Sequence, residues 1–228
     1  MRTTLGITLV NWRHSFVTYL VTGLFFAAGL SNYITSAAQD AQDNQLVPVG
    51  HFLYLGPILL AILLPARHLI RLAHLGASRL GYFAGAWLTF AVPVALAVFA
   101  DIVLHRTLDP YAREHFIGGF LDLFDVFGFA AHGPVVAFAQ MSSLLFLLCC
   151  FLHTLTLLQG SVAGWVADAL IIAIIAVFTP IAPLRAAEGW FFHQIIFQGN
   201  SAAQITTCLS LAVVVYALGL IPLRAKAL

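Results

Sequence analysis

Six separate apolar segments, each close to the length of a membrane-spanning helix, limit how this chain can fold more than any other feature. A helix needs about 20 predominantly apolar residues to cross the hydrocarbon core of a bilayer. The segments are Phe16 to Ile34, Gly50 to Ala66, Tyr82 to Leu104, Pro134 to Leu155, Val162 to Pro180 and Ala203 to Pro222. Only short connections separate them, so we expect one all-α integral membrane domain over residues 1–228, with six transmembrane helices.

The composition agrees with a membrane environment. Charged residues make up 8% of the chain and hydrophobic residues 61%, whereas soluble domains carry about 25% charged residues. The three cysteines, Cys149, Cys150 and Cys208, lie in apolar runs and match no zinc-site spacing, so we expect them to be packing residues. The chain has no basic stripe with interleaved aromatic residues, and we expect no nucleic acid partner.

The basic residues predict the orientation of the helices. With a cytoplasmic N-terminus, the basic residues assigned to the cytoplasmic side are Arg2, Arg13, Arg67, Arg71, Arg79, Arg224 and Lys226. Those on the outer side are Arg106, Arg113 and Arg185, and an excess of Lys and Arg on the cytoplasmic side is typical of membrane proteins. We therefore expect both termini in the cytoplasm. A single lysine among 10 basic residues suggests a GC-rich genome, and with it a multi-pass protein of a bacterial cytoplasmic (inner) membrane.

The connection between the second and third spans combines apolar and basic residues at helical spacing. Leu69 and Leu72 alternate with polar positions, which predicts a short amphipathic helix at the membrane surface over Ala66 to Leu75. Gly76 can end this helix and Ser78 can cap the next one. The helix could be a simple connector, or a docking element through which a cytosolic partner moves the membrane helices, and the pattern leaves both interpretations open.

The next ten residues, GASRLGYFAG (Gly76 to Gly85), resemble the G-x-S-R-x-x-Y/F-F-x-G segment of permease subunits in ABC-2 type transporters. In that family the segment enters the third helix directly after a cytoplasmic coupling helix. Six spans with both ends inside also fit the family. The apolar stretch from Ala186 to Asn200 is too short to cross, and lies where the family often has a re-entrant segment between helices 5 and 6.

The resemblance implies the transmembrane subunit of an ATP-driven ABC exporter, surrounded by membrane lipids and paired with a second permease subunit, identical or related. It also implies an ABC ATPase subunit as partner. The residues expected at the ATPase contact are Arg67, Arg71, His74, Ser78 and Arg79. This chain has no G-x-x-x-x-G-K-[ST] phosphate loop, so ATP and Mg would bind to a separate ATPase chain. We expect no catalytic residue and no cofactor in this chain, and the transported substrate stays unspecified.

Ionisable residues at membrane depth are candidate functional sites because burying a charge in lipid is costly. Asp168, near the cytoplasmic end of the fifth span, is the only acid that does not fall on or near the outer side. It could pair with an arginine of the coupling loop or contact the ATPase. It could also be an interfacial carboxylate that touches lipid headgroups and water.

Nine histidines are many for a chain with so few charges, and they raise the alternative of a histidine-ligated membrane haem or redox subunit. No spacing places two of them on one helical face, so we expect interfacial histidines and no metal. An outer cluster of His105, His115 and His132 could still bind a metal if the connecting loop folds over it. A non-catalytic membrane assembly subunit is a further alternative that no feature of the sequence excludes.

The outer connection from Leu108 to Gly133 is rich in phenylalanine. Phe116, Phe120, Phe124 and Phe127 follow helical spacing, which predicts an interfacial helix with an aromatic face. Such a helix could pack on lipid or on the other spans, or it could form an outer gate.

Overall fold

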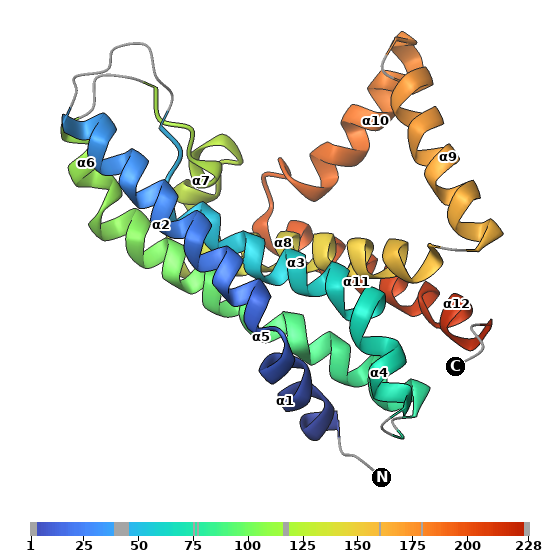
Figure 1. Cartoon of the computed structure of the whole chain (residues 1–228). Helices are drawn as coiled ribbons and strands as arrows, with labels where there is room; N and C mark the ends of the chain where they lie inside the picture. The colour runs from blue at the N-terminus through green and yellow to red at the C-terminus, as the bar shows by residue number, and fades with distance from the viewer. Residues whose placement is uncertain are drawn as a thin grey trace.

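The computed structural model describes residues 4–38, 46–74, 76, 78–115, 119–159, 161–178 and 180–225, and these residues are almost entirely helical (Figure 1). Helical stretches long and apolar enough to cross a membrane are Phe16–Thr35, Val49–His68, Arg79–Thr107, Pro134–Leu158 and Ser201–Leu223. Within the described ranges, extended segments meet only at an isolated bridge between Leu46 and Phe120. The chain is thus a multi-pass membrane protein by length and composition of its helices.

The chain begins with two helices, α1 (Thr4–His14) and α2 (Phe16–Ala38), which are separated at Ser15. Figure 1 shows α1 at the lower end of the molecule, together with the C-terminal helix α12 (Leu220–Ala225). We call this end the termini end. The opposite end, formed by residues 46–54, 101–115 and 119–132, is called the loop end.

Helix α1 packs on α5 (Arg79–Thr107) through a glycine. A Cβ atom at Gly85 would lie 2.6 Å from Cγ2 of Ile7, so only glycine lets the two helices approach this closely. Buried polar contacts fix the register, since Asn11 Nδ2 donates to Thr89 Oγ1 at 3.2 Å and Trp12 Nε1 donates to the Thr89 carbonyl at 2.9 Å.

The second long helical segment of the bundle, residues 49–74, is called the second rod, and its helical type changes along its length. It consists of a 3-10 helix η1 (Val49–Tyr54), α3 (Leu55–Leu63), a π-helical turn η2 (Leu64–His68) and α4 (Leu69–His74). Pro65 has no backbone N–H, so it cannot donate to the carbonyl of Ala61 one turn earlier. That carbonyl lies 3.2 Å from Nδ1 of the fully buried His153, which supplies the missing donor.

The turn from α4 into α5 has the stop and start signals that the sequence predicts. Gly76 adopts a left-handed conformation with φ of +76°, which ends the preceding helix. Ser78 is the N-cap of α5, and its Oγ accepts a hydrogen bond from the backbone N–H of Gly81 at 3.0 Å. The predicted surface helix is present as α4, but it continues directly from the second rod through η2.

The remaining bundle helices are α8 (Pro134–Leu158) and α11 (Ser201–Leu218), which pack along one another, and α8 also contacts α3 and α5. Asn200 caps α11, its Oδ1 accepting from the N–H groups of Ala202 and Ala203. Cys149, Cys150 and Cys208 are free and buried, which confirms their predicted packing role.

A pair of helices, α9 (Val162–Phe178) and α10 (Ala182–Ile195), forms a separate hairpin bent by 115° (Figure 1). Most side chains of α9 are exposed, whereas α10 returns to the bundle and buries Ile195. The predicted fifth span, Val162 to Pro180, coincides with α9, which at 17 residues is short for a crossing. The described chain therefore has five unbroken candidate spans, and a sixth only if the bent pair counts as one.

The aromatic connection does not form the predicted continuous helix within the part that the structure describes. It contains α6 (Asp109–His115), α7 (Leu123–Val126) and the 3-10 turn η3 (Phe129–His132), whereas Phe116 lies outside the described residues. Asp122 caps α7, and Gly128 and Gly133 have φ values of 73° and 81° that interrupt any regular helix.

Candidate functional site

Buried ionisable side chains gather at the loop end, and we call this group the loop-end cluster. Its members are His51, Tyr54, Asp101, His105, Asp109, Arg113 and Asp122. Asp101 and His105 lie one turn apart on α5, and Asp109 follows after another four residues, at the start of α6. Because residues four apart share a helix face, these three side chains point to the same side.

Asp101 is the centre of the first half of the cluster and is fully buried. Its Oδ2 lies 2.9 Å from His51 Nδ1 and accepts the hydroxyl hydrogen of Tyr54. Its Oδ1 has no hydrogen-bond partner among the described residues and lies against the backbone at Gly50. A side chain at residue 50 would overlap this carboxylate. Because Gly50 has no side chain, Asp101 fits between η1 and α5.

The hydrogen bonds of His51 define its protonation state. Its Nε2 accepts the backbone N–H of Leu123 at 2.9 Å, so the proton belongs on Nδ1, where it is donated to Asp101. With one nitrogen accepting and the other donating, His51 is a neutral imidazole. The 3.4 Å contact of Nε2 with Asp122 Oδ1 is then not a hydrogen bond.

Asp122 joins the connecting segment to α5 and α6, because it contacts His105 and Arg113. As the N-cap of α7, its Oδ1 accepts the N–H of Phe124 at 2.9 Å. Its Oδ2 lies 2.7 Å from His105 Nδ1 and 2.8 Å from an Arg113 nitrogen. Burial alone would raise the pKa of this carboxyl group, but the close contact with His105 and the backbone N–H of Phe124 outweigh it and hold the pKa far below its usual range.

Arg113 forms the partly exposed rim of the cluster. It bridges Asp122 and Asp125, at 2.8 and 2.5 Å, and its guanidinium lies 4.4 Å above the ring of Phe120. Its partial burial acts to lower the pKa, but the two carboxylates, Asp125 first, raise it. Arg113 therefore stays charged and holds the Asp122 carboxylate in place.

His105 and Asp109 are the members of the cluster whose buried polar atoms have the fewest hydrogen bonds. His105 Nδ1 lies 2.7 Å from Asp122 Oδ2 and 3.5 Å from Asp109 Oδ2, yet the directions of these contacts match no hydrogen bond. Asp109 is 1% exposed, and its Oδ2 has no hydrogen-bond partner among the described residues. Its Oδ1 lies 3.5 Å from the hydroxyl of Tyr33, so that oxygen is held from α2.

The sequence analysis found only part of this cluster. Of the trio His105, His115 and His132, His105 lies in the cluster, His132 is exposed on η3 and the side chain of His115 lies outside the described residues, so the trio stays a prediction. Asp101, His105 and Asp109 have a four-residue spacing that is visible in the sequence. His51 and Asp122 could not be added from spacing, because they join the cluster only through packing of distant segments.

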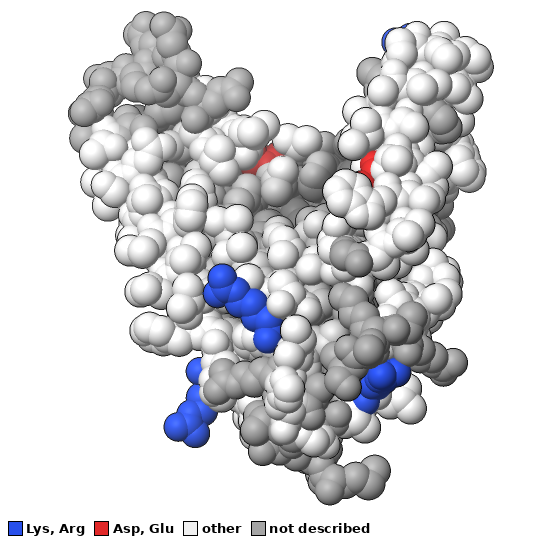
Figure 2. Space-filling model, turned by 45° about the vertical axis from the view of Figure 1, so that its right-hand side comes forward, with Lys and Arg blue, Asp and Glu red and all other residues white. Residues whose placement is uncertain are grey.

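The five residues predicted to contact an ATPase lie along the termini end. Arg67 is exposed on η2, His74 ends α4, Ser78 caps α5 and Arg79 begins it. Arg71 is on α4, and its side chain lies outside the described residues. On the face shown in Figure 2, the Lys and Arg side chains gather in the lower half of the molecule, apart from one at the upper right.

Asp168 does not contact a basic side chain in the described structure. Both of its carboxylate oxygens accept hydrogen bonds from Gln159 Nε2, at 3.1 Å, across the turn between α8 and α9. Asp168 and Gln159 are partly open to their surroundings, and the ATPase contact and the interfacial role of Asp168 both stay predictions.

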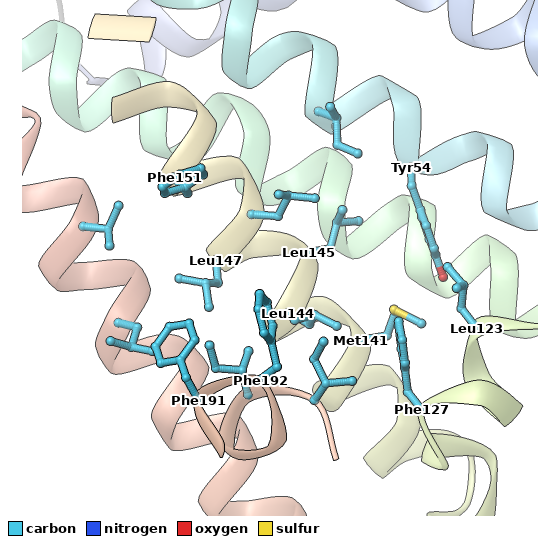
Figure 3. Close-up of a pocket in the computed structure, with 16 residues that line it drawn as sticks. Tyr54, Leu123, Phe127, Met141, Leu144, Leu145, Leu147, Phe151, Phe191 and Phe192 are labelled. Carbon is cyan, nitrogen blue, oxygen red and sulfur yellow. The ribbon is translucent and has the colours of Figure 1, made fainter. Parts of the chain in front are cut away.

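An apolar cavity of about 710 Å³ lies between the bundle and the returning helix α10 (Figure 3). Leu144 and Leu147 of α8 face Phe191 and Phe192 of α10 across it. Tyr54 is the one lining residue with a hydroxyl group, and that group is bound to Asp101. The lining therefore suits a hydrocarbon chain and offers no charged group to a polar ligand.

Two buried histidines bear on the haem alternative. His51 has both ring nitrogens engaged. The ring of His153 packs among Tyr82, Phe90 and Tyr216, with Nδ1 at the Ala61 carbonyl and with no hydrogen-bond partner for Nε2 among the described residues.

The chain matches no protein-family model, no curated protein and no solved structure. What the protein does has to be argued from the geometry of the chain itself.

Proposed function

We propose that this chain is the transmembrane subunit of an ATP-driven exporter of the ABC-2 type, acting in a bacterial cytoplasmic membrane. The observation that carries the proposal is the turn from α4 through Gly76 and Ser78 into α5. A short helix that ends in a left-handed glycine and is followed at once by a capped span is what a coupling element requires.

The two faces of this turn suit a docking role. Leu69 and Leu72 are buried and attach α4 to the bundle, whereas Arg67, His74 and Arg79 are exposed. A cytosolic partner could therefore bind the exposed basic residues without displacing the buried leucines that hold α4 on the bundle. Helix α5 extends over 29 residues from this turn to the loop end, with Pro93 inside it, so a movement of the turn could be passed along the helix to the loop end.

Two further features support the proposal. Helix α10 contains most of the stretch Ala186 to Asn200, for which the resemblance predicts a re-entrant segment, and it returns to the bundle after a bend of 115° from α9. The apolar cavity beside α10 has no charged lining, so a polar substrate would need a pathway elsewhere, such as the contact between two permease subunits.

The test is co-purification with an ATPase encoded beside this chain, followed by ATP hydrolysis measured in lipid nanodiscs. The double variant Arg67→Glu/Arg79→Glu should keep the protein folded and inserted, but should weaken ATPase binding and uncouple hydrolysis from the permease. The matched control is Arg106→Glu/Arg185→Glu, which reverses the same number of exposed charges on the other predicted side of the membrane.

The proposal fails if no ATPase associates with the wild-type chain, or if the two double variants behave alike. A Soret band in the absorption spectrum of the purified protein would favour the haem alternative instead. Stable association with a membrane complex that lacks an ATPase would favour the assembly subunit.

A further inference from the structure

The loop-end cluster buries three carboxylate groups. Asp101, Asp109 and Asp122 are each at most 1% exposed, and a buried carboxylate is costly unless it is paired. His51 and Tyr54 engage Asp101, and Arg113 engages Asp122. Asp109 Oδ2, in contrast, has no hydrogen-bond partner among the described residues.

The unsatisfied atoms of the cluster converge on one point. His105 Nδ1, Asp109 Oδ2 and Asp122 Oδ2 all lie within 4.8 Å of one another. Two of them, His105 Nδ1 and Asp109 Oδ2, are buried with no hydrogen-bond partner among the described residues, and Asp109 is only 1% exposed. Buried polar atoms are rarely left without partners, so a shared ligand explains both at once.

We propose that His105, Asp109 and Asp122 bind a divalent transition-metal ion, with Zn²⁺ as the best match. Imidazole nitrogen and carboxylate oxygen ligate zinc at about 2.0 to 2.2 Å, and three protein ligands leave a fourth position for water. Donor atoms 2.7 and 3.5 Å apart can both reach a metal at such distances after small side-chain movements.

The surroundings of the three ligands resemble the outer shell of a metal site. Tyr33 lies at the second oxygen of Asp109, and the backbone N–H of Phe124 binds the second oxygen of Asp122. Such outer contacts orient metal ligands and raise their affinity. The side chain of His105 is 23% exposed, which gives an ion a route into the site.

A bound ion would connect two segments that are distant in sequence. His105 ends the long helix α5, whereas Asp122 caps α7 in the connecting segment. The metal would therefore hold the connecting segment onto the loop end. This inference does not depend on the exporter proposal.

The experiment measures Zn²⁺ bound to the full chain in detergent, after removal of metals with a chelator and dialysis against the ion. We expect one Zn²⁺ per wild-type chain and a rise in unfolding temperature with Zn²⁺ concentration. Asp109→Asn and His105→Ala should each weaken binding by about tenfold or more.

The matched controls are Asp168→Asn and His132→Ala. Asp168 binds Gln159 across the turn between α8 and α9, and His132 is an exposed residue of η3, so both changes remove the same groups away from the three ligands. These variants should bind Zn²⁺ like the wild type. Equal losses in ligand and control variants would overturn the proposal, as would a wild-type chain that binds no Zn²⁺.

A second measurement covers the case in which His105→Ala or Asp109→Asn does not fold. X-ray absorption of the wild-type protein loaded with Zn²⁺ should show nitrogen and oxygen ligands that include one imidazole. Sulfur at about 2.3 Å would mean that the ion is held by cysteines, and the proposal would be wrong.

Discussion

His51 Nδ1 lies 2.9 Å from Asp101 Oδ2, across the contact between η1 and α5, with neither side chain open to solvent. The pair joins the second rod of the bundle to its longest helix at the loop end. Truncating one partner of such a pair leaves the other polar group buried without a partner. The free-energy cost of that unpaired group exceeds the net stabilisation that the intact pair provides.

Asp101→Asn should therefore destabilise the protein by about 1 to 3 kcal/mol, because an amide oxygen at Oδ2 accepts more weakly from Tyr54 and His51, and the amide N–H groups would be buried at Oδ1, where no described residue accepts. Asp168→Asn should change stability by less than about 0.5 kcal/mol, because its partner Gln159 lies in an open turn and an amide oxygen can still accept. Unfolding in detergent, followed by tryptophan fluorescence, compares the two variants. Equal effects would contradict the assignment of Asp101 as the buried acid and Asp168 as the interfacial one.

Gly50→Ala should lower the free energy of unfolding by about 1 to 3 kcal/mol, because the new methyl group would overlap the carboxylate of Asp101. Gly23→Ala is the matched control, since a Cβ at Gly23 meets no atom within 4 Å. We expect the control to be neutral or slightly stabilising, as alanine favours a helix over glycine. Chemical denaturation of both variants checks this, and a tolerated Gly50→Ala would count against the close approach of η1 and α5.

Gly85→Leu should displace α1 from α5, because the larger side chain would occupy the space of Ile7. Trypsin cleavage after the exposed Arg13 should then become faster by about fivefold or more, which corresponds to a docking loss of at least about 1 kcal/mol. Mass spectrometry of the released peptide measures this rate. Gly23→Leu serves as the control and should leave the rate unchanged, since that position faces open space on α2.

The sequence predicts well those features that depend on local signals. Hydropathy alone locates the long helices, because a membrane span is a continuous apolar run. The helix end at Gly76 and the cap at Ser78 are also local signals, and the structure confirms them.

Features that depend on the packing of distant segments were not predictable. The phenylalanine spacing around residues 116–127 suggests a helix, but the cap at Asp122 and the left-handed Gly128 give a short turn instead. Likewise, nothing near Asp101 in the sequence indicates that a histidine 50 residues earlier will meet it. The bend between α9 and α10 shortens the fifth predicted span, although Pro180 and Pro183 mark a break near that place.

The buried carboxylate of Asp101 also bears on how the chain enters the membrane. Asp101 is the only acidic residue of α5, and a lone carboxylate makes an apolar helix a poorer substrate for insertion. Its two partners, His51 and Tyr54, belong to the rod that is synthesised before α5. When α5 leaves the ribosome, the groups that accommodate its carboxylate are already in place, so this helix can enter beside its neighbour rather than alone. The order of the helices along the chain thus matches an order of insertion in which Asp101 is not left alone in lipid.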